Sequence, residues 1–119
     1  MTDLVLCLSD EKSLSHLKRL VKDGEWGKVF VVTTEACRKN FSDDFEGRPH
    51  FICADFSKPV AELIKDLEKS LKGKFSDFEV ALNIVSGGGK EHMAILAAVL
   101  RTGVGIRLVA VTKDGISEL

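Results

Sequence analysis

The fold of this chain is decided by the stretch Asn83-Ile84-Val85-Ser86-Gly87-Gly88-Gly89-Lys90. An apolar strand, predicted over residues 78–85, runs into three consecutive glycines and a lysine, and an Ala- and Leu-rich helix follows. Glycines leave the backbone uncovered, so a ligand can lie against peptide N–H groups. The start of the helix adds unpaired N–H donors and the positive end of its dipole, and Lys90 adds a full charge. The pattern predicts a strand, a turn and a helix around a cradle for phosphate.

Apolar runs alternate with helical stripes on both sides of this stretch. Residues 4–8 form a continuous apolar run, typical of a parallel strand covered on both faces. Residues 14–21 and 60–71 repeat apolar side chains at helical spacing. This alternation predicts one domain, residues 1–119, with a Rossmann-like three-layer α/β sandwich around a mainly parallel sheet of about five strands. The expected strands span residues 4–8, 29–32, 51–54, 78–85 and 106–111, and residues 113–115 should form a tight turn.

The composition limits the class of protein. The chain has 119 residues, of which 45% are apolar and 29% charged, and its net charge is −1. This balance is ordinary for a soluble domain and argues against a nucleic-acid coat protein, so we expect no direct DNA binding. No apolar run approaches the ~20 residues of a membrane span, and the amino end lacks a basic secretion signal. Cys7 and Cys53 lie in apolar runs and are expected to be buried thiols of a cytoplasmic protein.

Polar residues gather where the expected strands end. In open α/β sheets, ligands bind beyond the carboxyl ends of strands, at the point where the strand order reverses. If the first and fourth strands are central neighbours, Ser9 and Asp10 lie beside the loop 86–90. Helix capping by the residues after strands one and two, and a solvated histidine at position 92, are the simpler interpretations. The candidate ligand-binding residues are Ser9, Asp10, Thr33, Ser86, Gly87, Gly88, Gly89, Lys90 and His92.

Known motifs do not account for the glycine loop. A nucleotide-triphosphate P-loop needs Ser or Thr after its lysine, but Glu91 follows Lys90 here. The dinucleotide pattern Gly-x-Gly-x-x-Gly lacks its third glycine and belongs at the first strand. No His/Asp/Glu set has metal-ligand spacing and no Ser-His-Asp arrangement is readable, so no metal or cofactor is expected. Asn83 is polar within an apolar strand and is expected to brace the loop, whereas His16 and His50 are assigned no role.

The helix after the glycines is apolar all round. Residues 93–100 read Met-Ala-Ile-Leu-Ala-Ala-Val-Leu, whereas a helix that lies on a sheet needs a single apolar stripe. We expect the excess to form a homodimer interface. The alternative is that strands and helices of the same subunit bury it.

These residues together resemble the CARF domain (CRISPR-associated Rossmann fold). The resemblance lies in a first strand that ends in Ser9, a second that ends in Val-Thr-Thr-Glu at residues 32–35, and the stretch 83–90 before an Ala/Leu helix. The ending, residues 113–119, is also similar to that of the family. The family commonly has Thr-Gly-Gly-Thr-Lys in the loop, where this chain has Ser86 for the first Thr and Gly89 for the second.

The resemblance implies a homodimer that binds a cyclic oligoadenylate, most commonly cyclic tetra-adenylate, across its two-fold axis. Lys90 and the amides of Gly87 to Gly89 would hold phosphate or ribose, and Ser9 would lie at the floor of the pocket. The chain shows no effector domain, so two versions are open: it senses or sequesters the messenger, or it degrades it as a metal-independent ring nuclease. In such nucleases Lys90 would stabilise the charge that develops as the ribose 2′-hydroxyl attacks its phosphate, and Ser9 would orient the ribose. No side chain is an obvious general base.

Two other classes stay open at this point. A response-regulator receiver domain has the same alternation, with Asp55 at the place of its phosphoacceptor; the other matching positions are Asp10, Ser86 and Lys113. The triple glycine has no role in that family, and the six residues after Lys113 are too few for its closing helix. A protein-interaction module that uses only the apolar helix, residues 91–102, would bind neither kind of ligand.

Overall fold

Six strands form one sheet, in the order β3-β2-β1-β4-β5-β6, in the computed structural model of the chain, which describes residues 1–119. The first five strands run parallel, and β6 pairs antiparallel with β5. The predicted Rossmann-like α/β class is confirmed, and the turn at residues 113–114 sends the chain back as a sixth strand. The strands are β1 (Asp3–Leu8), β2 (Val29–Thr33), β3 (His50–Cys53), β4 (Glu79–Asn83), β5 (Gly105–Thr112) and β6 (Gly115–Glu118).

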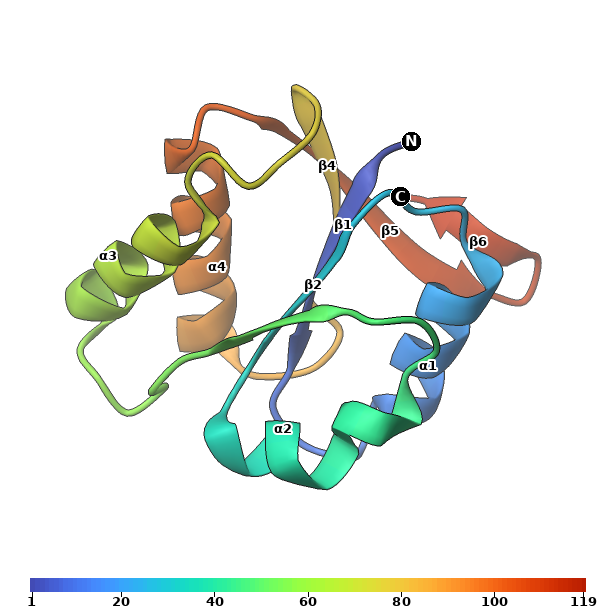
Figure 1. Ribbon diagram of the computed structural model, residues 1–119, viewed down its shortest axis with the longest axis horizontal. Helices are drawn as coiled ribbons and strands as arrows, with labels where there is room; N and C mark the ends of the chain where they lie inside the picture. Colours follow the sequence, from blue (N-terminus) through green and yellow to red (C-terminus); the bar gives the residue numbers. More distant parts are fainter.

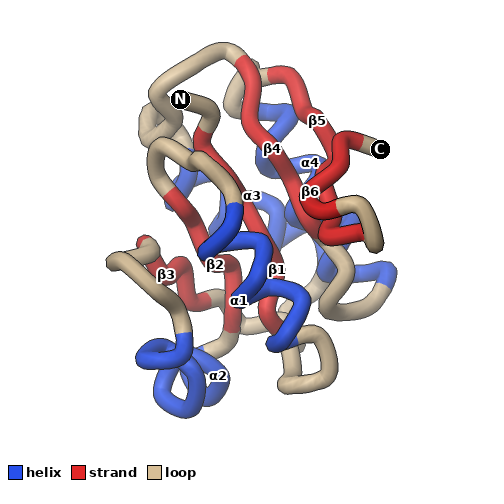
Figure 2. The backbone as a smooth tube through the Cα atoms, turned by 90° about the vertical axis from the view of Figure 1, so that its right-hand side faces the viewer, coloured by secondary structure: helices blue, strands red, loops and turns tan.

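Helices cover both faces of the sheet, as Figure 1 shows. α1 and α2 pack on one face, and α3 and α4 pack on the other. Right-handed crossovers explain this division, because the path from β1 to β3 and the path from β3 to β5 cross the sheet in opposite directions. Figure 2 shows α1 in front of the sheet, with α3 and α4 behind it. The helices are α1 (Leu14–Asp23), α2 (Glu35–Phe41), the 3₁₀ helix η1 (Ser42–Asp44), α3 (Val60–Leu71) and α4 (Gly89–Arg101).

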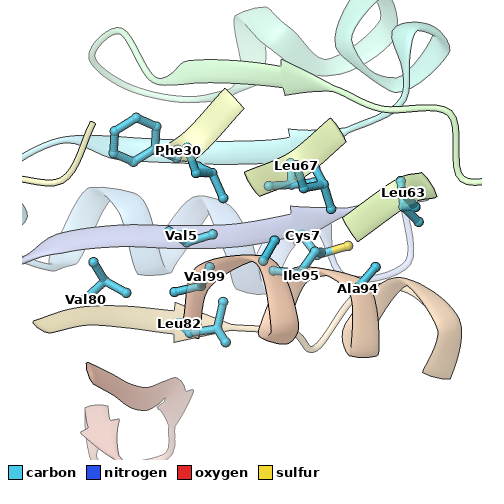
Figure 3. Packing of buried hydrophobic residues seen from close by; sticks show 13 residues of the cluster. Val5, Cys7, Phe30, Leu63, Leu67, Val80, Leu82, Ala94, Ile95 and Val99 are labelled. Atoms are coloured by element: carbon cyan, nitrogen blue, oxygen red, sulfur yellow. The ribbon is translucent and has the colours of Figure 1, made fainter. Parts of the chain in front are cut away.

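β1 is the centre of the fold, and all of its residues are buried. It lies between β2 and β4 and is covered on both faces, so alternate side chains enter two different cores. Val5 and Cys7 enter the core under α3 and α4, which Figure 3 shows. The leucines of β1 enter the core under α1 and α2. The two-sided burial is the reason for the continuous apolar run at residues 4–8.

Two expectations about the strands are wrong at their ends. β4 is shorter than the predicted range 78–85, because it pairs with β1 only over Val80–Asn83. Phe78, before β4, is 85% exposed, and Val85, after it, is half exposed. Cys53 was expected to be buried but is exposed, since it ends the edge strand β3, which has a neighbour on one side only.

The outer side of α4 carries an apolar stripe. The inner side is buried against the sheet and α3, through Ala94, Ile95, Ala98 and Val99. On the outer side Met93 is 64%, Leu96 37% and Leu100 52% exposed. The alternative in which one subunit buries the whole helix is therefore wrong. None of the helices has the length and apolar character that crossing a membrane requires.

Candidate functional site

The strand order reverses between β1 and β4, so the loops after these two strands meet at the switch point of the sheet. The Ser9 N–H donates a hydrogen bond to Ser86 Oγ at 3.0 Å, and the two hydroxyl oxygens lie 3.3 Å apart. The thiol of Cys37, in α2, donates a hydrogen bond to the Ser9 carbonyl. The expected adjacency of Ser9 and the glycine loop is confirmed, and Ser9 is fixed by contacts on both sides.

Gly87 is the residue where the loop comes closest to its neighbours. Its φ is +101°, a region that side chains rarely adopt. A methyl group placed on Gly87 would lie 3.3 Å from Cys7 Sγ and 3.4 Å from both Ser9 Oγ and His92 Nε2. The backbone conformation therefore favours glycine at this position, and a methyl group would fit only if these neighbours shifted by a few tenths of an ångström.

The next two glycines open the amino end of α4. Gly88 is the residue before the helix, and no side chain caps its N–H groups. The first backbone bond of the helix is donated by the His92 N–H to the Gly88 carbonyl, so the preceding N–H groups lack helical partners. Gly87 to Lys90 are all exposed. The arrangement offers main-chain donors and the Lys90 ammonium to an anion.

One carboxylate shares this end of the helix. A methyl group on Gly88 would lie 3.4 Å from Glu91 Oε2. A carboxylate in the first turn is stabilised by the helix dipole, and it also repels a bound anion. Glu91 therefore reduces the net positive potential of the cradle.

A shallow hollow of about 430 Å³ lies beside the glycine loop, where the amino ends of α3 and α4 meet. Asp55 is exposed in the loop between β3 and α3, and it accepts hydrogen bonds from the Ser57 N–H and hydroxyl. These bonds lower the pKa of Asp55, and the charges of Lys58 and Lys90 lower it further. Lys90, which lines the hollow, is therefore close enough to Asp55 for the two charges to interact. Its lining residues are Pro59, Val60, Gly89, Lys90 and Met93.

Two of the candidate ligand-binding side chains are closed to a ligand. Thr33 is fully buried, and its hydroxyl donates to the Leu8 carbonyl at 2.6 Å, which corrects its expected place in the site. The residue that caps α2 after β2 is the half-buried Thr34, whose hydroxyl accepts from the Cys37 N–H. Ser86 is 1% exposed, and its hydroxyl braces the loop by accepting from the Ser9 N–H.

Asp10 and His92 are held by local contacts. Asp10 is exposed, and its Oδ1 accepts from the Lys12 N–H. Because α1 begins only at Leu14, Asp10 forms a turn instead of the expected helix cap. His92 Nε2 lies 2.8 Å from the Ser86 carbonyl. A carbonyl can only accept, so Nε2 carries the proton and the ring is tied to the loop instead of being freely solvated.

Cys7 is a neighbour of the site that its sequence context did not reveal. Its Sγ lies under Gly87, on the face of β1 that packs against α4. Burial raises the pKa of the Cys7 thiol to about 12, and the charges of Glu91 and Asp10 raise it further. The thiol therefore stays protonated and fills space beneath the loop. Within residues 4–8 it reads only as another apolar position.

No protein-family model, curated protein or solved structure matches this chain.

The order of strands in the sheet shows that the receiver-domain alternative is wrong. Receiver domains have the order 2-1-3-4-5, which puts the third strand next to the first. Here β2 separates β3 from β1, so Asp55 does not lie beside Asp10 at a neighbouring strand end. No group of three His, Cys, Asp or Glu side chains is placed to hold a metal ion.

Proposed function

We propose that this chain is a CARF-type domain that binds a cyclic oligoadenylate, with cyclic tetra-adenylate as its principal ligand, in cytoplasmic type III CRISPR antiviral signalling. One observation carries the proposal: the consecutive residues Gly87 to Lys90 are all exposed at the switch point of the sheet, and Gly87 lies directly beside Ser9. Phosphates of the ring would take the main-chain donors and the lysine. The hollow beside Lys90 leaves room for an adjoining nucleoside.

A homodimer would double this site. A ring with internal two-fold symmetry fits a pocket built from two identical halves. The exposed stripe of Met93, Leu96 and Leu100 follows the same helix that begins at the glycine loop, so pairing through α4 would bring two loops toward one axis. Analytical ultracentrifugation should give a dimer. A monomer at all concentrations would contradict a pocket shared by two subunits.

Cleavage of the bound ring is the second part of the proposal. The ribose 2′-oxygen would attack the neighbouring phosphorus and break the bond to the 5′-oxygen, which leaves a 2′,3′-cyclic phosphate and a 5′-hydroxyl. Lys90 would stabilise the charge on the phosphoryl oxygens, and Ser9 would orient the ribose. The step consumes no other reactant, because the 2′-hydroxyl loses one proton and the 5′-oxygen gains one.

The test uses labelled cyclic oligoadenylates of three ring sizes and reads both retention and products. Lys90→Ala should weaken binding by at least about tenfold while the fold stays intact, since it removes a charge-assisted contact. Lys69→Ala is the matched control, because Lys69 is an exposed lysine in the last turn of α3, away from the loop. Equal affinity of the parent chain and Lys90→Ala would remove Lys90 from the site. No retention of any ring would refute the proposal.

The exposed α4 stripe also supports a simpler function as a protein-interaction module. A chain that dimerises through α4 and retains no cyclic oligoadenylate would favour that candidate. The same binding and sedimentation measurements therefore separate the two functions.

A further inference from the structure

β5 continues past the end of β4, and two side chains occupy the place of the missing strand. The pairing of the two strands ends at Leu82 and Leu108, whereas β5 runs on to Thr112. The Val109 carbonyl accepts from Asn83 Nδ2 at 2.9 Å. The Val111 N–H donates to His16 Nε2 at 3.4 Å. Asn83 and His16 thus satisfy backbone groups that a longer β4 would have paired.

Asn83 connects this junction to the glycine loop. Its side chain is nearly fully buried, and its Nδ2 also lies 3.1 Å from His16 Nε2. Its Oδ1 accepts from the Val85 N–H at 3.1 Å. The carbonyl partner on one side and the N–H partner on the other fix the orientation of the amide. Val85 directly precedes Ser86, so one side chain joins α1, β5 and the start of the loop.

The geometry requires a neutral His16. Its Nε2 faces two donors, the Asn83 amide and the Val111 N–H, so this nitrogen must carry a lone pair and the proton must be on Nδ1. The groups that face it from β4 and β5 are uncharged, and the charged neighbour on α1 is Arg19, which repels a second positive charge. Burial, and then the charge of Arg19, lower the pKa of His16 below its ordinary range.

We propose that His16 is a positioning residue that holds the ligand-binding loop through Asn83, and that protonation of His16 at mildly acid pH releases this contact and weakens binding. With a proton on Nε2, three N–H donors would face one another without an acceptor: His16 Nε2, Asn83 Nδ2 and the Val111 N–H. The Asn83 amide would then have to turn away from His16. That turn would also disturb the bond from Val85. His16 does not touch the ligand, and the binding consequence rests on the proposed function.

The matched variants are His16→Gln and His50→Gln. The glutamine at position 16 can accept hydrogen bonds through its side-chain oxygen but does not titrate. His50 is an exposed histidine on β3, outside this network. Nuclear magnetic resonance of the parent chain should show His16 titrating below about pH 6.5 with its proton on Nδ1. The amide signals of Val85 and Gly87 should shift with pH at the same midpoint as the His16 ring. This pH-dependent shift should persist in His50→Gln and should be absent in His16→Gln.

Binding of labelled cyclic tetra-adenylate is then compared at about pH 8 and about pH 5. The parent chain and His50→Gln should lose about tenfold in affinity on acidification, on the scale of one hydrogen bond, and His16→Gln should lose clearly less. An equal loss in His16→Gln, or amide signals that ignore His16, would overturn the positioning role. If no ring binds at any pH, the proposed function fails, and the amide titration alone decides whether His16 positions the loop.

Discussion

Substitution of Gly87 by alanine tests whether the glycine loop is packed as tightly as the structure shows. A side chain at φ +101° is strained, which costs about 1–3 kcal/mol. The three side chains that the new methyl group would meet are held in place. Cys7 lies in the core, while Ser9 and His92 are hydrogen-bonded to Ser86. We therefore expect the free energy of unfolding to fall by about 2–3 kcal/mol.

The assay is urea denaturation, together with thermal unfolding. For a chain of 119 residues, an entropy of unfolding near 2.1 cal/mol/K per residue converts a loss of ~2 kcal/mol into a fall in Tm of about 8 °C. Gly89→Ala is the matched control, because a methyl group there meets no atom within 4 Å and the backbone φ is not positive. This variant should be at least as stable as the parent chain. Equal stability of Gly87→Ala and Gly89→Ala would refute the described packing around Gly87.

Two further variants test the roles of the carboxylates of Asp3 and Glu91. Asp3 is buried and accepts from the Lys28 and Ser76 N–H groups; burial raises its pKa, but these bonds outweigh that effect and the net pKa is lowered. The stabilisation by the ionised Asp3 is therefore present at neutral pH and is lost as the pH falls below about 3.9. Asp3→Asn should lower the free energy of unfolding by about 1–3 kcal/mol at pH 7, and should make stability depend less on pH in the acid range. An unchanged dependence in the acid range would contradict this role of Asp3. Glu91→Gln should tighten anion binding about three- to fivefold in calorimetry, since it removes a carboxylate beside Gly88, and weaker binding would show that Glu91 contacts the ligand favourably.

Local pattern was enough to predict the class of fold. The apolar run at residues 4–8, the stripes of α1 and α3 and the glycine loop before α4 each depend on the few residues around them, because side-chain periodicity is a local property. Strand ends were predicted less well, since Phe78 and Cys53 owe their exposure to where the neighbouring strands stop and to which strand forms the edge.

The composition of the site was decided only by the tertiary structure. The sequence placed polar residues at the ends of strands. It did not show that the Thr33 hydroxyl donates to the Leu8 carbonyl, or that His16 of α1 contacts Asn83 at the end of β4. Such contacts join residues that are 25 and 67 positions apart, and they follow from the strand order and the handedness of the crossovers. The chain by itself determined which segments become strands and helices, because that choice is local. Only packing of the whole sheet determined which strand ends meet, because that choice depends on every connection at once.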